Sequence, residues 1–344
     1  MTDRKSAASS GRSGKKGFSD KGLAMAGIWI FAEHAGQALE LLHAAHSLID
    51  AGMGGELTAF SWPGGPAPDE LGAGGADEVL MLPALAEDQP LEAYAPAILV
   101  DARQERPDLL LFAATARGKD LAAQIAAGLD AGLCSGCISL HWDKESKTLE
   151  MERLLYGGAA VQRIAPLAFP VLAAVPPGTF RAGPGNPGRE PRIRHLMPPP
   201  ASPVAVQERK PRQRLEQDIS ASKVVVCAGR GFEKREDLAL ARELADALGG
   251  ALACTRPLSE EMHWLPEDLC IGLSGIQVKP DVYIGIGVSG QVQHLTGIRG
   301  AKVVCAVNRD EQAPIFAAAD LGVVGDLYAV LPRLLQALKE AASS

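Results

Sequence analysis

The hydrophobic positions of this chain follow a repeated order, in which a short apolar run precedes an amphipathic stretch. In the first half, apolar runs of strand length lie at 28–31, 57–60, 78–82 and 108–114. After the first run, apolar residues return at the spacing of one helix face, at Ala38, Leu41, Leu42, Ala45 and Leu48. Strands that alternate with helices of this length predict a mostly parallel sheet with helices on both faces.

A second series of the same kind begins at residue 223. Its apolar runs lie at 223–228, 251–254, 282–286, 302–307 and 320–324, and its helix-like stretches at 235–248 and 326–342. The first series also predicts helices around 91–104 and 115–131, and further strands at 151–156 and 171–175 that extend its sheet. The predicted fold class is therefore α/β, with two doubly wound, mostly parallel sheet domains, of which the C-terminal one is Rossmann-like.

Proline and glycine interrupt the pattern between the two series. Nine prolines and four glycines fall within 176–203. Because proline fits neither central strands nor helix interiors, this stretch is predicted to be a linker or a surface arm, and to act as a hinge. The expected division is a disordered basic tail at 1–25, a first domain at 26–176, a Pro/Gly-rich linker at 177–222 and a second domain at 223–340.

Charge and cysteine content narrow the classes of protein. The formal net charge of -7 argues against a nucleic-acid surface, and no apolar run is long enough to predict a membrane span. The first 22 residues contain six Lys or Arg and no apolar core, so they are not expected to be a secretory signal. Only Cys134 and Cys137 of the six cysteines form a close pair, which predicts buried thiols, no metal site and a cytoplasmic location.

Side chains that directly follow the predicted strands of the second series form a candidate ligand site. Ligands of open α/β sheets lie at the carboxyl ends of the strands. The set comprises Arg230, Thr255, Arg256, Ser289, Gly290, Gln291, Val292, Gln293, His294 and Asn308, with the turn Gly272, Leu273, Ser274 and Gly275, and with Asp326 and Leu327. Two arginines, hydroxyls and a histidine around glycine turns suit a ligand with a pyrophosphate and a polar aromatic ring. Because no nucleophile–base pair or paired carboxylates accompany them, no catalytic residue is expected, and the site is predicted to hold a ligand rather than cleave it.

Six motifs keep one order and spacing through 223–340. They are GRG at 229–231, TR at 255–256, IGLSG at 271–275, VKPDVYIGIGVSGQVQHLTGI at 278–298, VNRDEQAPIFAAADLG at 307–322 and DLY at 326–328. Together these motifs closely resemble the FAD domain of the electron transfer flavoprotein alpha subunit. The first series fits more loosely, through 109–129 and 153–160, so that the resemblance covers roughly 26–340.

The resemblance implies non-covalent FAD as the cofactor. The implied contacts are Arg230, Thr255, Arg256, Ile271, Gly272, Leu273, Ser274, Ser289, Gly290, Gln291, Val292, Gln293, His294, Asn308, Asp326 and Leu327. Arg256 is expected over the isoalloxazine ring, Ser274 at flavin N5 and His294 as a donor to the flavin C2 carbonyl. Ser289 and neighbouring backbone N–H groups are expected at the pyrophosphate.

Three departures from the family pattern accompany this resemblance. The usual family turn reads GQTG, whereas Leu273 here replaces its amide side chain and Ser274 keeps its hydroxyl. Gln291 stands where the family has a small residue, and the segment 257–270 is about one residue longer than usual.

The resemblance also implies an electron carrier rather than an enzyme. The expected assembly is a heterodimer with an electron transfer flavoprotein beta subunit, which transiently contacts flavin dehydrogenases of the acyl-CoA dehydrogenase type and an acceptor such as a quinone oxidoreductase. The resemblance does not decide between simple electron transfer and flavin-based electron bifurcation. It also leaves open whether the beta subunit holds a second FAD or an AMP. Alternatives are a flavin-binding structural or redox subunit of a larger dehydrogenase complex, a flavin-free structural subunit, and an NAD- or thiamine-diphosphate-type enzyme domain. The absorbance spectrum discriminates the flavin carrier from the last two.

Overall fold

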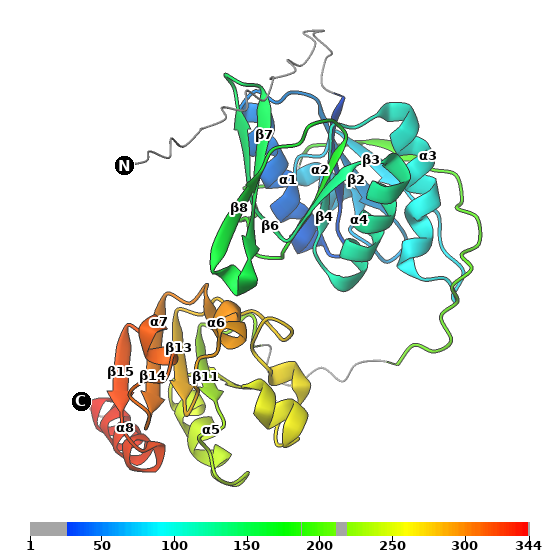
Figure 1. The fold of residues 1–344 in the computed structure, drawn as a ribbon. Helices are drawn as coiled ribbons and strands as arrows, with labels where there is room; N and C mark the ends of the chain where they lie inside the picture. Colours follow the sequence, from blue (N-terminus) through cyan, green and yellow to red (C-terminus); the bar gives the residue numbers. More distant parts are fainter. Residues whose placement is uncertain (1–25, 187, 211–218, 343–344) are drawn as a thin grey trace, which may run out of the picture. The chain divides into compact units, whose positions relative to one another are not determined.

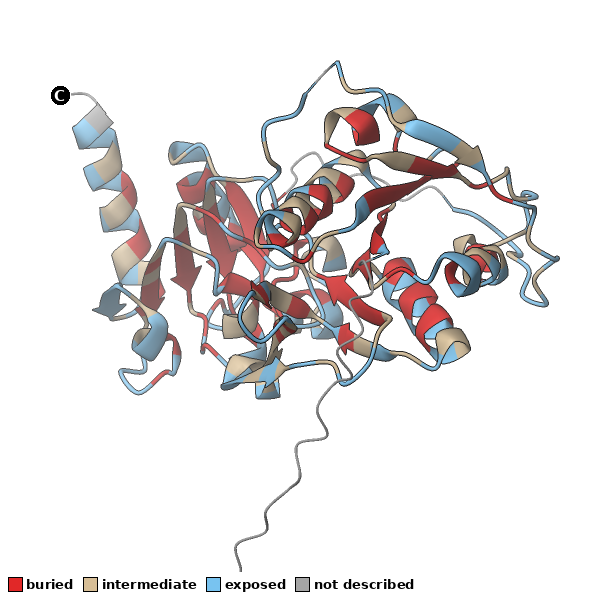
Figure 2. Cartoon of the chain, turned by 90° about the horizontal axis from the view of Figure 1, so that it is seen from above, coloured by how far each residue is buried: buried red, intermediate tan, exposed pale blue. Residues whose placement is uncertain are grey.

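The computed structural model describes residues 26–186, 188–210 and 219–342, and the predicted tail at 1–25 lies outside this range. The described residues form two compact units, one from those within 26–153 and 163–206, the other from those within 154–162 and 207–342. Figure 1 labels many of their helices and strands, and Figure 2 shows buried residues along the strands and on one side of most helices. Each unit has its own hydrophobic core, as expected for separate α/β domains.

The first unit is built on a seven-stranded sheet in the order β10-β3-β2-β1-β4-β9-β5. Its strands are β1 (Gly27–Phe31), β2 (Glu56–Ser61), β3 (Glu78–Met81), β4 (Leu109–Ala113), β5 (Gly132–Ser135), β9 (Val171–Val175) and β10 (Arg192–His195). All of the pairings between these strands are parallel, and Ile28 of β1 lies opposite Leu57 on one side and Leu109 on the other. The predicted parallel sheet is confirmed.

Both faces of this sheet are covered, which explains the continuous apolar runs. Ile28 and Ile30 of β1 pack with α1 (Ala35–Asp50) and α2 (Pro68–Ala73). The alternate residues Trp29 and Phe31 pack on the other face with α3 (Ala95–Glu105), which follows the short η1 (Leu91–Tyr94), and with α4 (Ala116–Leu129). Successive side chains of a strand point to opposite faces, so each strand of this sheet contributes to two cores.

A smaller antiparallel sheet covers part of the α1 face. It consists of β6 (Cys137–Asp143), β7 (Thr148–Leu155) and β8 (Ala160–Ile164), and Trp142 and Leu149 join the core beneath it. The strand predicted at 151–156 belongs to this sheet instead of extending the parallel one. An apolar run of strand length does not identify the partner strand, so the sequence alone could not separate the two.

The proline-rich stretch differs from the expected linker in its described part. Residues 163–206 belong to the first unit, and β10 pairs in parallel with β3 at the edge of the sheet. Arg194 of β10 contacts Asp101 at 2.7 Å and Glu78 at 3.4 Å. Farther along, the Val206 amide donates to the Asp88 carbonyl at 2.7 Å. Proline is compatible with an edge strand. The described residues up to 206 are therefore part of the first unit, and the hinge stays a prediction.

We expect Arg194→Ala to lower the unfolding free energy of the first unit by about 1–2 kcal/mol, because two half-buried carboxylates lose their shared cation. Denaturant-induced unfolding, monitored by tryptophan fluorescence, measures this loss of unfolding free energy, since three of the four tryptophans belong to the first unit. Arg181→Ala, at an exposed arginine of the same stretch, is the matched control. An unchanged midpoint for Arg194→Ala would show that β10 is not held by these ion pairs.

The second unit contains a five-stranded, entirely parallel sheet in the order β12-β11-β13-β14-β15. Its strands are β11 (Val224–Ala228), β12 (Ala251–Cys254), β13 (Val282–Ile286), β14 (Val303–Asn308) and β15 (Leu321–Val324). Its helices are α5 (Leu238–Ala247), α6 (Val292–Ile298), α7 (Ile315–Ala318) and α8 (Leu327–Ala342), with short turns η3 (Pro257–Glu261) and η4 (Glu267–Leu269). All five strands predicted for this domain are present.

Residues 154–162 group with the second unit through their turn, η2 (Tyr156–Gly158). The Thr296 hydroxyl donates to the Gly157 carbonyl at 2.8 Å, and Arg299 donates to the Gly158 carbonyl at 2.9 Å.

Five of the six cysteines are buried, Cys305 is half-buried, and all six are free thiols. Within the described residues, no helix is both long enough and apolar enough to cross a membrane.

Candidate functional site

The strand order of the second unit places a topological switch point between β11 and β13. From β11 the chain moves to β12 on one side of it, then returns to β13 on the other side. Loops that leave in opposite directions open a crevice at the carboxyl ends of these two strands, where open α/β sheets bind ligands.

Glycines allow the two loops at this switch point to touch. The Gly231 amide donates to the Gly287 carbonyl at 3.0 Å. A Cβ on Gly231 would lie 2.7 Å from Gly287 Cα, and a Cβ on Gly229 would lie 2.3 Å from the Gly287 carbonyl oxygen. Any side chain at these positions would force the loops apart, which explains the GRG motif after β11.

The loop after β12 supplies an orphaned hydroxyl and a cation. Thr255 is buried, and its Oγ1 has no hydrogen-bond partner within the described part of the chain. Arg256 is exposed, and its Nε lies 3.0 Å from Glu260 Oε1 while its Nη2 donates to Ser274 Oγ. A buried unpartnered hydroxyl beside an exposed guanidinium fits a polar anionic ligand that would satisfy both.

The turn at 271–275 is held against α6 by backbone contacts. The Leu273 amide donates to the Gln293 carbonyl at 2.8 Å, and the Leu273 side chain is 55% exposed. A Cβ on Gly297 would lie 2.6 Å from the Gly272 nitrogen, so only glycine allows this approach. The turn therefore presents Leu273 and Ser274 outward from a fixed backbone.

The loops after β13, β14 and β15 are tied to one another. Asn308 Nδ2 donates to the Val288 carbonyl at 2.8 Å, and the Ile315 amide donates to the Ser289 carbonyl at 3.0 Å. Asp326 Oδ1 accepts from the Tyr328 amide at 2.9 Å, so this carboxylate caps the start of α8. Because one carboxylate oxygen of Asp326 caps the helix, this side chain has less hydrogen-bonding capacity left for a ligand. The exposed Ser289 hydroxyl makes no such capping hydrogen bond in the described structure.

His294 is buried, with protein partners at both ring nitrogens. Its Nε2 lies 2.7 Å from the Tyr283 hydroxyl, and its Nδ1 lies 3.2 Å from the Ile271 carbonyl oxygen. Burial lowers the pKa of His294 to about 4, so the ring is neutral near pH 7. Donation from His294 to a flavin carbonyl would require one of these two contacts to break.

The structure brings the predicted residues together at one edge of the sheet but divides them by exposure. The exposed members are Arg230, Arg256, Leu273, Ser274, Ser289, Gln291, Val292, Gln293 and Asp326. The buried members are Thr255, Ile271, Gly272, Gly290, His294 and Leu327, and Asn308 is half-buried. The exposed side chains can therefore contact a ligand directly, whereas most of the buried residues determine the course of the backbone.

The sequence did not predict two residues of this site, Tyr283 and Glu260. Tyr283 lies in an apolar strand and looks like an ordinary core residue, although a buried tyrosine hydroxyl needs a partner. Glu260 pairs with Arg256 four residues earlier, on a turn that the sequence did not predict to be helical. The spacing of opposite charges was the available signal for Glu260.

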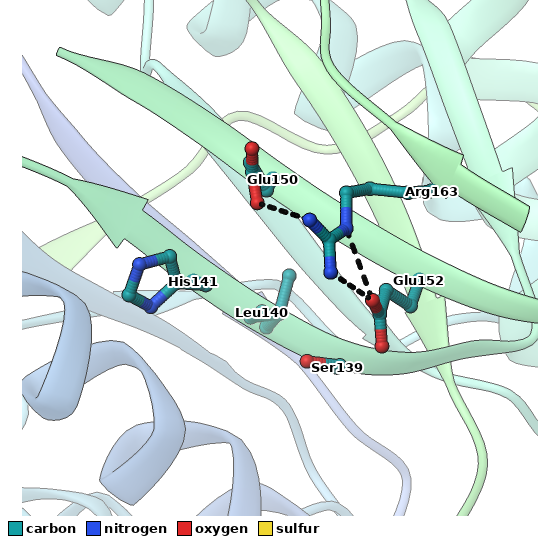
Figure 3. A pocket seen from close by; sticks show the side chains of 6 residues that line it. All are labelled: Ser139, Leu140, His141, Glu150, Glu152 and Arg163. Atoms are coloured by element: carbon teal, nitrogen blue, oxygen red, sulfur yellow. Dashed lines mark hydrogen bonds and ion pairs between the residues drawn. The ribbon is translucent and has the colours of Figure 1, made fainter. Parts of the chain in front are cut away.

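A separate concavity of about 480 Å³ lies in the first unit, on the sheet of β6, β7 and β8. Figure 3 shows Arg163 directed at Glu150 and Glu152, with ion-pair distances of 3.6 Å and 3.1 Å. The Arg163 side chain is 66% exposed, and its charge is already paired. Arg163 therefore does not offer an unpaired cation to a ligand here.

The donor set at the carboxyl edge of the second unit fits the phosphates and the polar ring of FAD. Hydroxyls, arginines and close-packed glycine loops match a dinucleotide phosphate and a polar ring. In the parts of the chain that the structure describes, no group of three or more His, Cys, Asp or Glu side chains could hold a metal ion.

Comparisons with known proteins agree with this geometry. Residues 28–201 match the electron transfer flavoprotein domain, and residues 218–299 match the electron transfer flavoprotein FAD-binding domain. Protein FixB of Salmonella paratyphi A is 32% identical over 318 residues, which cover 90% of this chain and 97% of that protein. Protein FixB of Escherichia coli O157:H7 is 32% identical over 317 residues, with the same coverage.

A solved structure described as a thiamin diphosphate-dependent enzyme from Mycobacterium smegmatis covers 87% of this chain and 54% of its own. Its TM-score of 0.22 and 14% identity are too low to support an argument. The two domain matches together span most of the chain, and the FixB relatives align over nearly their whole length. The chain therefore belongs to the electron transfer flavoprotein alpha family, and its second unit contains the FAD-binding domain of that family.

Proposed function

We propose that this chain binds one FAD at the carboxyl edge of the second unit and carries electrons as the alpha subunit of a heterodimer. The observation that carries the proposal is the loop after β12, where the unpartnered Thr255 hydroxyl adjoins Arg256 and its contact with Ser274. This loop lies within the stretch that matches the FAD-binding domain. Bound FAD would supply reversible electron transfer, while the protein sets its position and potential.

In this proposal, each group of exposed residues has a distinct task. Arg256 and Ser274 face the flavin ring, where a guanidinium stabilises the negative charge that reduction adds. Ser289 and the glycine-bounded backbone after β13 receive the pyrophosphate, since close backbone approach exposes N–H groups to anionic oxygens. Arg230, after β11, adds a second positive charge at the same edge of the sheet.

Electron transfer flavoproteins of this family pair with a beta subunit. We propose that a beta subunit completes the assembly here, and that flavin dehydrogenases and a downstream acceptor contact it transiently. A carrier needs no acid–base group at this site, because a flavin that only exchanges electrons needs positioning more than proton transfer.

Leu273 favours a second candidate, a flavin-binding structural or redox subunit of a larger dehydrogenase complex. Its side chain is apolar and 55% exposed in the turn expected to face the flavin. An exposed apolar side chain in this turn suits contact with a neighbouring protein surface. The usual family turn has a polar amide side chain at this position instead. The two candidates differ in whether the purified assembly passes electrons to a separate dehydrogenase or acceptor.

Titration of the purified full-length chain with FAD, alone and after co-expression with its beta subunit, tests the proposal. We expect a yellow protein with one FAD per chain, and tighter binding in the heterodimer because a partner that completes the pocket stabilises the bound state. Absorbance and quenching of flavin fluorescence measure the binding. A folded, colourless heterodimer that ignores added FAD would contradict the proposal.

A further inference from the structure

We propose that Tyr283 is a positioning residue of the flavin site, whose hydroxyl holds the His294 ring so that the two residues clamp the turn at 271–275 against α6. The effect on FAD rests on the proposed function given above. The hydrogen bonding inside the clamp can be measured on the flavin-free chain, so the two ideas can fail separately.

The direction of each hydrogen bond follows from the chemistry of the partners. The Ile271 carbonyl oxygen only accepts, so the His294 Nδ1 that lies 3.2 Å from it must carry a proton. The ring is neutral, so Nε2 then has a free lone pair. The Tyr283 hydroxyl, 2.7 Å from Nε2, is therefore the donor in this pair.

These contacts join three parts of the second unit. The series runs from Tyr283 of β13 to His294 of α6 and on to the Ile271 carbonyl of the turn, and all three residues are buried.

Gly285 makes this geometry possible. A Cβ on Gly285 would lie 3.1 Å from Tyr283 Cε1 and 3.2 Å from its hydroxyl oxygen. The tyrosine ring thus lies along its own strand over Gly285, which shares its face of the sheet. A larger residue at 285 would push the hydroxyl away from His294, so the alternation of tyrosine and glycine in VYIGI has a specific use.

The clamp fixes the part of the turn that faces the proposed flavin. The Ile271 carbonyl is its anchor, and two residues later the Leu273 amide donates to the Gln293 carbonyl of α6 at 2.8 Å. Ser274, the next residue, is exposed and accepts from Arg256. Release of the anchor would therefore move the hydroxyl and the guanidinium that we assign to the flavin ring.

The first test measures the His294 ring itself. Selective ¹⁵N-histidine labelling of the flavin-free full-length chain, with His294→Gln to identify the signal, reports which ring nitrogen is protonated. In the wild type we expect Nδ1 to carry the proton and Nε2 to accept a hydrogen bond. In Tyr283→Phe, the Nε2 resonance should move toward that of a nitrogen without a hydrogen bond. A protonated Nε2 in the wild type, or an Nε2 resonance unchanged by Tyr283→Phe, would overturn the proposal.

The second test asks whether Tyr283 acts through His294. Tyr283→Phe should raise the FAD dissociation constant about tenfold and speed hydrogen exchange at the Leu273 amide. In the His294→Gln background, the same substitution should have less than about a twofold further effect. Additive effects in this double-mutant cycle would show that Tyr283 does not position the site through His294.

Tyr94→Phe is the matched control, because the buried Tyr94 hydroxyl also donates a single 2.7 Å hydrogen bond, to the Pro83 carbonyl, but belongs to the first unit. It should lower stability without moving the His294 resonances, and a shift as large as that of Tyr283→Phe would contradict a local clamp.

If the wild-type heterodimer ignores FAD while the Nε2 result holds, the proposed function fails and the clamp stands.

Discussion

Gly290→Ala is expected to weaken FAD binding by at least about 100-fold, through the backbone of the loop after β13. Gly290 has a φ of 81°, a conformation that costs most other residues about 1–2 kcal/mol. Its Cβ would also lie 2.3 Å from the nitrogen and 2.5 Å from the Cα of Ile315. These neighbours are backbone atoms at the start of α7, so no side-chain rotation relieves the clash.

The loop must therefore leave α7, and the bond from the Ile315 amide to the Ser289 carbonyl breaks with it. Fluorescence titration with FAD measures the loss, and circular dichroism shows that the variant remains folded. Gly249→Ala separates backbone strain from the clash, because Gly249 has a φ of 60° with open space around its Cβ position. If Gly290→Ala bound FAD within threefold of the wild type, this loop would not form the proposed pyrophosphate site.

The apolar runs predicted the central strands because those strands are buried on both faces. β1, β4 and β11 are continuous hydrophobic segments, and each lies between two strands in its sheet. The edge strand β10 was missed because its sequence, RIRH, is polar and follows a proline-rich stretch. At an edge, ion pairs and one line of backbone hydrogen bonds replace burial, and hydrophobic periodicity does not detect either.

The candidate site was predictable to the extent that chain order determines it. Residues after parallel strands must meet at one edge of the sheet, so Thr255, Ser289 and Asn308 could be grouped without coordinates. The orientation of each side chain was not predictable, because it depends on contacts between elements distant in sequence. His294 illustrates this, since its partners come from Tyr283 on β13 and from the Ile271 carbonyl in the turn.

The charge around Arg256 should tune the reduction potential of the bound flavin. If Arg256 faces the flavin as proposed, Arg256→Ala should lower the reduction potential by about 60 mV or more, because a nearby cation favours the reduced, more negative flavin. Glu260 should act in the opposite direction, since its carboxylate lies 3.0 Å from Arg256 Nε and partly neutralises that cation. Glu260→Gln is therefore expected to raise the potential by about 20–40 mV, a smaller shift because this ion pair is exposed and screened.

Spectroelectrochemical titration of the FAD-loaded heterodimer measures both shifts. Glu261→Gln removes the same charge one residue farther along, at an exposed position, and should leave the potential nearly unchanged. Both shifts should shrink as salt is added, because exposed charges are screened over about 10 Å at 0.1 M ionic strength. If Arg256→Ala left the potential unchanged with FAD fully bound, Arg256 would not face the flavin ring. A lowered potential in Glu260→Gln would show that the ion pair holds Arg256 in place for the flavin, because its release would then remove the cation from the ring.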